Sequence, residues 1–389
     1  MQEVLVTLRV ACLSSAQGCY GLKMNDLFLN FKILLSFWDI IKRRDFILGK
    51  AVKDFEKKLA LYLEAPYVLG VASCTDALIL SLKALGIGHG DEVIVPAVSF
   101  FSTAGAVSWV NAKPVFVDIE EKSFNINSDL IEKVIMPKTK AIIVAHLAGR
   151  MAALEKISAL TGKYNLYLIE DAAQTLGAKY KNRHIGYYAD LACLSFNPQK
   201  ILSAYGDGGA IVTGQTALAE KISMMRMYGA NGYKEVSFRH PIAGVSSRLS
   251  SFQAAVLNIK LDQLNKIIEK WRKNYFLYSE LLRGVDSIVL PETPSEDYYI
   301  NGYRFIILTK KRDELLKYLR DNRVDARSHY SVPLPYLGAF EYLNYKKGDF
   351  PVAEKFAEES LALPLSHRIS ESEMRHIADL IRKFFEVIE

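Results

Sequence analysis

The chain has 389 residues, half of them hydrophobic and 24% charged, and its 49 basic and 43 acidic residues give a formal net charge of +6. This length allows a large core and two domains, and the composition is ordinary for a globular protein. The basic clusters at 42–44 and 310–311 are isolated and have no zinc-finger spacing near them. We therefore expect solvated basic faces there and no nucleic-acid partner.

The cysteines contain no CxxC pair and no cluster with histidine. They are Cys12, Cys19, Cys74 and Cys193. This spacing predicts neither a metal site nor a disulfide framework. Free thiols suit a reducing compartment, so we expect a cytoplasmic protein.

Residues 1–23 superficially resemble a signal peptide, because an apolar run is followed by small residues. Glu3 is the only charge ahead of that run, and Arg9 interrupts it. A secretory signal has a basic start and an uninterrupted apolar segment. We therefore reject export and interpret residues 1–23 as an extension outside the fold, ahead of a chain start at Met24.

The next segment, residues 27–41, is apolar enough to suggest a membrane helix. Lys32 and Asp39 interrupt it, and it is shorter than the roughly 20 apolar residues that a span needs. We therefore expect no membrane contact. The segment predicts a helix that packs on the domain surface or against a partner chain.

From residue 46 the chain alternates between predicted helices and predicted strands. Helices are predicted at 52–63, where apolar residues recur every four positions, and at 77–85. Strands are predicted at 67–72, 93–95, 114–118, 141–145, 166–169, 191–196 and 210–213. Several of these runs are continuously apolar, which is typical of parallel strands buried on both faces. The fold class is therefore α/β, with a mostly parallel central sheet flanked by helices.

Polar residues follow several of the predicted strands, and ligands of such sheets bind beyond the carboxyl ends of the strands. Residues 73–76 (SCTD) join a strand to a helix, where free N–H groups and the helix dipole favour an anion such as a phosphate monoester. Plain N-capping by Ser73 or Thr75 explains the same residues. At the end of a second strand, Phe100 belongs to the core or covers a flat cofactor.

Two charged residues stand next to buried strands. Asp171 follows the apolar run 166–169, where an unpaired carboxylate is costly, so it either caps a helix, pairs with a basic side chain or holds a proton on a ring nitrogen. Lys200 stands between the runs 191–196 and 210–213, ahead of a glycine-rich stretch. Considered without the other residues, Lys200 is best explained as a solvated lysine in a turn.

A lysine that forms a Schiff base, an aspartate for a pyridinium nitrogen and a helix start for phosphate together indicate pyridoxal 5'-phosphate. None of these features suffices alone. Their occurrence at successive strand ends makes the combination more specific. The chain has no GxGxxG and no GxxxxGK[ST] pattern, so a Rossmann-type dehydrogenase is disfavoured.

Beyond the predicted sheet, apolar residues between 257 and 278 recur at alternating steps of four and three, which predicts one long amphipathic helix. It would link a large domain at 24–256 to a small α+β domain within 257–389. In the small domain we expect a strand at 303–308, a helix near 314–319, and a final helix that begins with the capping box Ser370-x-x-Glu373. His329 lies in a loop, where it either contacts substrate or, as is more common for a lone loop histidine, is solvated.

The chain resembles the DegT/DnrJ/StrS family of sugar aminotransferases, which are pyridoxal phosphate enzymes of fold type I. The resemblance runs from about residue 24 to the C-terminus. Its segments are FILG at 46–49, ASCTDAL at 72–78, GDEVIVP at 90–96, IEDAAQTLGA at 169–178, SFNPQK at 195–200, GDGGAIVT at 206–213, GVSSRLSSFQAAVL at 244–257, HYSVPL at 329–334 and FPVAE at 350–354. IEDAAQ with SFxxxK is the most specific pair.

The resemblance implies a role for each matching position. Lys200 would carry the cofactor and move the proton, and Asp171 would hold the ring nitrogen protonated. The other implied cofactor contacts are Gln174 near the ring oxygen, Ser195, Cys74, Thr75 and Asp76 at the phosphate, Phe100 on the ring, and Ser246 from a partner chain. The implied substrate contacts are Arg248, His329 and Tyr330. The implied assembly is a homodimer with shared sites.

The implied reaction moves an amino group from L-glutamate to a nucleotide-linked keto-sugar. GDGG at 206–209 favours a 3-keto over a 4-keto sugar, and Lys200 argues against the family's dehydratase branch, where a histidine replaces it. Three departures from the family pattern are Ser246 in place of asparagine, Ala148 with Arg150 in the HLYG segment, and Ser331 with Pro335 near the HYPxPL segment. They indicate an unusual sugar, a weakened enzyme, or a non-catalytic regulatory or sensory relative that binds the cofactor.

Overall fold

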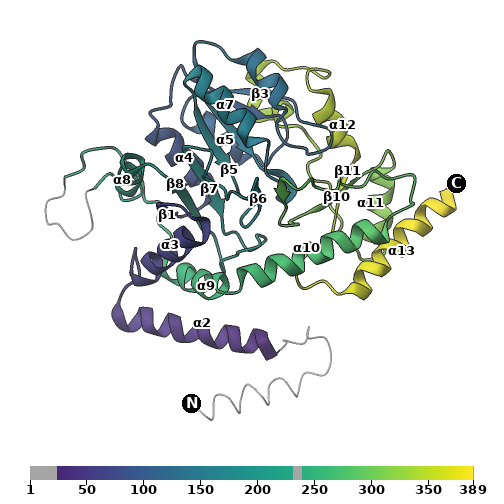
Figure 1. Cartoon of the computed structure of the whole chain (residues 1–389), viewed down its shortest axis with the longest axis horizontal. Helices are drawn as coiled ribbons and strands as arrows, with labels where there is room; N and C mark the ends of the chain where they lie inside the picture. The colour runs from purple at the N-terminus through teal and green to yellow at the C-terminus, as the bar shows by residue number, and fades with distance from the viewer. Residues whose placement is uncertain (1–23, 231–238, 389) are drawn as a thin grey trace.

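The computed structural model describes residues 24–230 and 239–388, so the predicted extension at 1–23 lies outside the described residues. Two helices come first, α2 (Met24–Arg43) and α3 (Lys50–Leu63). The segment 27–41 thus forms a helix as predicted, and α2 lies at the outer edge of the molecule, beside α9 (Ser251–Leu261) (Figure 1). Within the part of the chain that the structure describes, no helix has the length and apolar character to cross a membrane.

A seven-stranded sheet forms the centre of the molecule (Figure 1). In spatial order its strands are β1 (Tyr67–Val71), β8 (Gly209–Thr213), β7 (Leu191–Ser195), β5 (Tyr167–Asp171), β4 (Thr139–Ala145), β2 (Glu92–Pro96) and β3 (Lys113–Val117). β8 runs antiparallel to both of its neighbours, and the other neighbouring strands pair in parallel. The predicted α/β class with a mostly parallel sheet is confirmed.

Both faces of the sheet are buried, because successive side chains of a strand point to opposite sides. On one face, Ile143, Ile169 and Ile211 pack in a core shared with α4 (Cys74–Ala84), α5 (Ser102–Trp109) and α8 (Thr216–Met225). On the other face, Val144 and Leu168 pack in a core shared with α3, α7 (Leu154–Tyr164), α9 and α10 (Leu264–Leu281). This arrangement explains the continuous apolar runs.

Several short elements connect these layers. They are α6 (Ser128–Ile131), the 3-10 helices η1 (Glu132–Val134) and η2 (Leu147–Gly149), and the paired strands β6 (Lys179–Tyr180) and β9 (Tyr298–Tyr299). The pairing of β6 with β9 joins a loop near the large sheet to a segment more than 100 residues later.

The prediction of one long helix over 257–278 is wrong, because the chain forms α9 and α10 with a break at Asp262 and Gln263. Gln263 has φ −110° and ψ 2°, outside the helical region. Its N–H bonds to the carbonyl of Lys260 at 3.0 Å, a bond over three residues rather than four. The apolar spacing continues through the break, so the periodicity did not reveal it.

The C-terminal part contains a second small sheet, in which β10 (Phe305–Leu308) pairs antiparallel with β11 (Ser360–Leu363). Around it lie α11 (Arg312–Asp321), η3 (Leu334–Tyr336), η4 (Gly338–Leu343), α12 (Pro351–Glu359) and α13 (Glu371–Ile388). The predicted capping box is confirmed: the Ser370 N–H donates to Glu373 Oε2 at 2.8 Å, and the Glu373 N–H donates to Ser370 Oγ at 3.2 Å. α10 runs from α9 to α13 along one side of the molecule (Figure 1).

Candidate active site

The carboxyl ends of β1, β5 and β7 meet at one edge of the central sheet. Across the strands, Gly209 at the start of β8 lies between Val71 and Ser195, and Asp171 lies opposite Cys193. The segments that follow these strands therefore lie together, as expected for the ligand-binding edge of a parallel sheet.

Gly209 allows β8 to lie against the first turn of α4. A side chain at this position would place its Cβ 2.7 Å from the backbone nitrogen of Cys74 and in collision with the carbonyl group of Ser73. Because real Cβ atoms do not approach other atoms so closely, only glycine fits here without movement. The close approach brings the glycine-rich stretch after Lys200 to the start of α4.

The start of α4 has both of the features that its sequence allowed. Ser73 caps the helix by accepting a hydrogen bond from the Asp76 N–H at 3.1 Å, which confirms the capping alternative. The N–H groups of Cys74 and Thr75 belong to the first turn of α4, where backbone N–H groups have no intrahelical acceptor. They are therefore available to an anion. The Thr75 hydroxyl lies 2.7 Å from the Ser102 hydroxyl at the start of α5. Two hydroxyls and two amides thus gather at one point.

Asp171 ends β5 and is almost fully buried. Its Oδ2 accepts a hydrogen bond from the Thr103 hydroxyl at 2.6 Å, and its Oδ1 accepts one from the Ala173 N–H at 3.3 Å. The Cys74 thiol lies 3.9 Å from Oδ1. Of the alternatives considered for Asp171, a salt bridge is not present among the described residues, and the carboxylate is held by neutral donors.

Lys200 follows β7 and faces the C-terminal part of the chain. Its Nζ lies 3.4 Å from the Tyr303 hydroxyl and 5.1 Å from the centre of that ring. Burial and the charge of Asp171 raise the pKa of the Cys74 thiol, whereas the charge of Lys200 lowers it. The Cys74 thiol, at the start of α4, therefore interacts electrostatically with both the carboxylate and the ammonium group.

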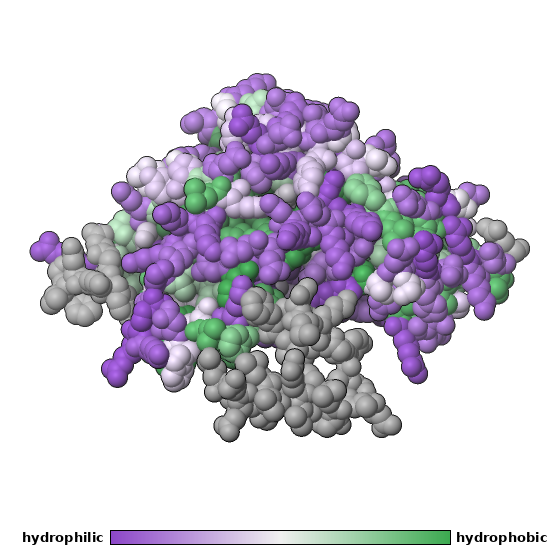
Figure 2. Space-filling view, turned by 60° about the horizontal axis from the view of Figure 1, so that its bottom comes forward, coloured by the Kyte–Doolittle hydropathy of each residue, from purple (hydrophilic) through white to green (hydrophobic). Residues whose placement is uncertain are grey.

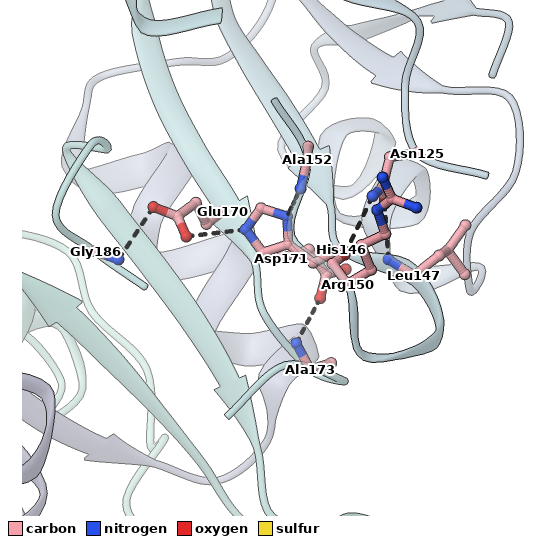
Figure 3. Close-up of polar contacts among 9 residues, drawn as sticks. All are labelled: Asn125, His146, Leu147, Arg150, Ala152, Glu170, Asp171, Ala173 and Gly186. Carbon is pink, nitrogen blue, oxygen red and sulfur yellow. Dashed lines mark hydrogen bonds and ion pairs between the residues drawn. The ribbon is translucent and has the colours of Figure 1, made fainter. Parts of the chain in front are cut away.

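Glu170, next to Asp171, points to the opposite face of β5 and binds His146 (Figure 3). The His146 Nδ1 accepts a hydrogen bond from the Ala152 N–H at 3.1 Å, so the ring proton lies on Nε2 and is donated to Glu170 Oε2 at 2.9 Å. Glu170 Oε1 accepts from the Gly186 N–H at 3.1 Å. The backbone N–H of His146 also donates to the backbone carbonyl of Asp171 at 3.1 Å. These bonds fix the end of β5.

The side chains of Gln174 and Tyr330 contact each other at the site. The Gln174 side chain accepts a hydrogen bond from the Ala148 N–H at 2.9 Å and donates one to the Tyr330 hydroxyl at 3.4 Å. The Phe100 ring is 58% exposed and lies 6.4 Å from the Tyr330 ring, centre to centre. Phe100 is therefore outside the core, beside Tyr330.

His329 lies in a loop, as expected, and is partly exposed. Its ring stacks on Tyr330 with centres 4.1 Å apart, and its Nε2 is buried without a hydrogen-bond partner in the described structure. Burial, together with the charges of Arg304 and Lys200, lowers the pKa of His329 to about 3. The ring is therefore neutral at neutral pH and can exchange one hydrogen bond with a ligand.

No described contact joins the remaining predicted residues to Lys200, although Ser195 lies opposite Gly209 at the same sheet edge. Ser195 accepts a hydrogen bond from the Asn197 N–H at 3.4 Å, beside β8. Arg248 donates to the Ser246 hydroxyl at 2.6 Å and lies over the Tyr228 ring, and no described contact joins either residue to Lys200 or Asp171. Between them, the Ser247 hydroxyl donates to Asp76 Oδ2 at 2.7 Å, so the pair lies near the first turn of α4.

Sequence reasoning missed four residues that shape the site: Thr103, His146, Tyr303 and Arg304. Thr103 lies in the polar run after β2, and this run was a usable signal. Tyr303 was assigned to a strand, although β10 begins only at Phe305. No local pattern connects the segment at 303–304 to Lys200, because the contact spans about 100 residues of chain.

The comparisons with known proteins agree with this geometry. The model of the DegT/DnrJ/EryC1/StrS aminotransferase family matches residues 32–382. The chain is 38% identical to a pleiotropic regulatory protein of Geobacillus stearothermophilus, over 89% of this chain and 92% of that protein. It is 36% identical to dTDP-3-amino-3,4,6-trideoxy-alpha-D-glucose transaminase of Streptomyces venezuelae, over 88% and 89% of the two chains.

Solved structures give the same picture. DesV of S. venezuelae, in complex with a ketimine intermediate, matches with a TM-score of 0.89 at 35% identity, over 93% of this chain and 96% of that one. NtdA of Bacillus subtilis, with the bound cofactor PMP, matches with a TM-score of 0.83 at 29% identity, over 93% and 82% of the two chains.

The pair of His146 and Glu170 makes a prediction about stability. Glu170→Leu removes both acceptors and leaves His146 Nε2 and the Gly186 N–H buried without partners. Each unsatisfied group costs about 1–3 kcal/mol, so we expect the free energy of unfolding to fall by at least about 2 kcal/mol in urea denaturation. The control is Glu155→Leu, which removes an exposed carboxylate paired with Lys181 and should change stability by less than about 1 kcal/mol. Equal losses in both variants would contradict this account.

His329 makes a prediction about pH. Because its pKa is about 3 in the folded chain and near 6.5 when unfolded, the unfolded state binds one more proton between these values. Acidification from pH 6.5 to 4.5 therefore favours unfolding, by up to about 1 kcal/mol per pH unit at this residue. We expect His329→Gln to lose less stability over this range than the parent protein, whereas His89→Gln, at an exposed position, behaves like the parent. An unchanged pH slope in His329→Gln would refute the assignment.

Proposed function

Because the chain belongs to the DegT/DnrJ/EryC1/StrS aminotransferase family, we propose that it uses pyridoxal 5'-phosphate to transfer an amino group from L-glutamate to the keto group of a nucleotide-linked sugar. The family is one of aminotransferases, and the S. venezuelae relative is named as a sugar transaminase. The observation that carries the proposal is the gathering of Lys200, Asp171 and the start of α4 at one sheet edge.

The donors at this edge fit the cofactor at both of its ends. The Cys74 and Thr75 amides, with the hydroxyls of Thr75 and Ser195, would hold the phosphate at the start of α4. At the opposite end, the buried Asp171 carboxylate suits a protonated ring nitrogen, because its present partners are neutral donors.

Other residues would enclose the ring. Phe100 is exposed and would stack on the ring, and Gln174 has an amide that would reach the ring oxygen. Asp76 belongs to the first turn of α4, where the Ser247 hydroxyl donates to its carboxylate at 2.7 Å and fixes the side chain. We assign Asp76 to the phosphate end through its backbone rather than through its charge.

When bound, pyridoxal phosphate withdraws electrons from the carbon that bears the amino group. Lys200 would supply the amine that carries the cofactor, and the same amine would move the proton during transfer. The Tyr303 hydroxyl at 3.4 Å holds the Lys200 Nζ in place. The Asp171 carboxylate would maintain the positive charge on the ring nitrogen, and the bonds from Thr103 and Ala173 fix the orientation of this carboxylate. His329 and Tyr330 face the same space and would contact substrate.

We favour a 3-keto sugar over a 4-keto sugar. The name of the S. venezuelae relative places its amino group at carbon 3. The motif GDGG at 206–209 supports the same choice. The product would be an amino sugar for a surface polysaccharide or a secondary metabolite.

We also propose a homodimer with two shared sites. α2 exposes Leu34, Leu35 and Trp38, whose side chains are each more than half exposed. Figure 2, which turns the α2 side of the molecule forward, shows apolar patches among hydrophilic surface. Ser246 and Arg248 are not engaged by their own chain's Lys200, which leaves them free to serve a partner's site. Large exposed apolar areas are typical of surfaces that bind another chain.

A regulatory protein without turnover is the second candidate, because the G. stearothermophilus relative is named a pleiotropic regulatory protein. Addition of L-glutamate to the purified protein distinguishes the two candidates. Purified enzyme should be yellow with bound cofactor and should lose its visible absorbance when L-glutamate is added. A yellow protein that ignores glutamate would favour the regulatory function instead.

The central prediction is that Lys200→Ala abolishes transamination of nucleotide-linked 3-keto sugars, read by mass spectrometry. Without the amine, neither cofactor attachment nor proton transfer is possible. Lys270→Ala removes an exposed lysine on α10 and should retain full turnover. Turnover in Lys200→Ala at more than a small residue of the parent rate would refute the assigned role.

A second prediction concerns assembly. Sedimentation equilibrium should give twice the mass of one chain, and Trp38→Glu should shift the protein to monomers, because a charge on α2 cannot be buried without a partner. Trp109→Glu changes an equally exposed tryptophan on α5 and should leave the dimer intact. A parent protein that sediments as a monomer would contradict the proposed dimer.

A further inference from the structure

Asn301 is a fully buried polar residue in the segment that leads into β10. A buried side-chain amide is costly unless its donor and acceptor atoms are bonded, and here both are. The Asn301 Nδ2 donates to the backbone carbonyls of Gln174 at 2.9 Å and Leu176 at 3.1 Å. Its Oδ1 accepts from the Tyr303 N–H at 3.0 Å. One amide thus joins the segment that follows β5 to a segment about 125 residues later.

Gln174 is held both by its main chain and by its side chain, and Asn301 contributes to both. The backbone carbonyl of Gln174 accepts from the Asn301 amide, and its side-chain carbonyl accepts from the Ala148 N–H at 2.9 Å. Asn301 also donates its backbone N–H to the carbonyl of Gly149 at 3.2 Å, which fixes the residue next to Ala148. Asn301 therefore supports the contact between Gln174 and Tyr330 at the site.

Tyr303 depends on the same amide. Its ring is buried and lies 6.3 Å from the Trp271 ring of α10, centre to centre, and its hydroxyl lies 3.4 Å from the Lys200 Nζ. On the other side, a Cβ at Gly149 would collide with the Asn301 Oδ1 and lie 2.9 Å from the Tyr303 nitrogen. The turn that carries Tyr303 is therefore confined between η2 and α10.

We propose that Asn301 is a positioning residue, which keeps the Tyr303 hydroxyl at Lys200 while it holds Gln174 in place. The inference rests on the function proposed above, in which Lys200 moves the proton. No described contact joins Asn301 to Lys200, so its effect passes through Tyr303. A misplacement of about 1 Å at reacting groups can lower a rate about 100-fold. A buried amide that fixes such a group therefore controls the rate from outside the site.

Hydrogen exchange of the cofactor-free protein tests the network without turnover. Asn301→Leu replaces the amide with an apolar group of similar size. We expect the N–H groups of Tyr303 and Ala148 to exchange at least about 10-fold faster in this variant, because both lose protection when the amide is removed. Ala148 is the informative position, since its N–H is bonded to Gln174 and not to Asn301.

A double-mutant cycle tests the effect on the reaction, read as the rate at which the holoenzyme loses visible absorbance with L-glutamate. We expect Asn301→Leu to slow this step about 10- to 100-fold. In a Tyr303→Phe background the hydroxyl is already absent, so the slowing should be at least about 3-fold smaller. Such non-additivity is the signature of residues that act through one contact. A merely structural role slows both backgrounds by the same factor.

Asn274→Leu is the matched control, because it removes a buried amide of α10 that donates to the Ser366 carbonyl at 2.8 Å. It should leave exchange at Ala148 unchanged and should slow the reaction equally little in both backgrounds. Thermal unfolding verifies that each variant is folded.

Asn301→Asp is a second variant that keeps the shape of the side chain and the acceptor for the Tyr303 N–H. When ionised, the new carboxylate has no donor for the two carbonyls, whereas its protonated form donates to one of them. Burial favours the protonated form. The rate of this variant relative to the parent should therefore rise as the pH falls from about 8 to about 5.5.

Unchanged exchange at Ala148 in folded Asn301→Leu would overturn the proposal, and so would equal slowing in both backgrounds. If Asn301→Leu does not fold, a relative rate of Asn301→Asp that is independent of pH would overturn it instead. Failure of the proposed function has a different signature, because the parent holoenzyme then shows no absorbance change with L-glutamate. Exchange in the cofactor-free protein still decides whether Asn301 holds Gln174 and Tyr303 together.

Discussion

The common direction of β1, β5 and β7 is the constraint on which the site depends. Because these strands are parallel, their carboxyl ends meet at one edge. The residues that follow them are therefore brought together, although they are far apart in the sequence. β8 returns antiparallel between β1 and β7, and Gly209 lets it lie against the start of α4. Sheet topology therefore brings the stretch that follows Lys200 to the start of α4.

Two adjacent carboxylates at the end of β5 have different tasks because a strand points them to opposite faces. Asp171 is held by Thr103 and Ala173 and faces α4, where it is available to a ligand. Glu170 binds His146 on the other face and has no free lone-pair direction toward the site. Glu170 thus fixes the end of β5, whereas Asp171 lies beside the start of α4. Both must be paired, since each is nearly inaccessible to water.

Features set by local sequence could be predicted, and those set by packing between distant segments could not. The strands, the start of α4 and the position of Asp171 follow from apolar runs and the polar residues after them. The break between α9 and α10 could not be found, because the apolar spacing passes through it. Tyr303 reaches Lys200 only after the C-terminal part packs on the sheet. The burial of the His329 Nε2 has the same origin, because a loop histidine has no sequence signal for burial.

The central claim is that Lys200 carries pyridoxal phosphate. Lys260 is the natural rival, because it contacts the same loop through Ser203 and burial lowers its pKa to about 8. Borohydride reduction fixes the cofactor to the lysine that holds it, and mass spectrometry of the digested protein then identifies that residue. The account predicts a pyridoxyl group on Lys200 and none on Lys260. A label on Lys260, or no labelled lysine in the yellow protein, would contradict it.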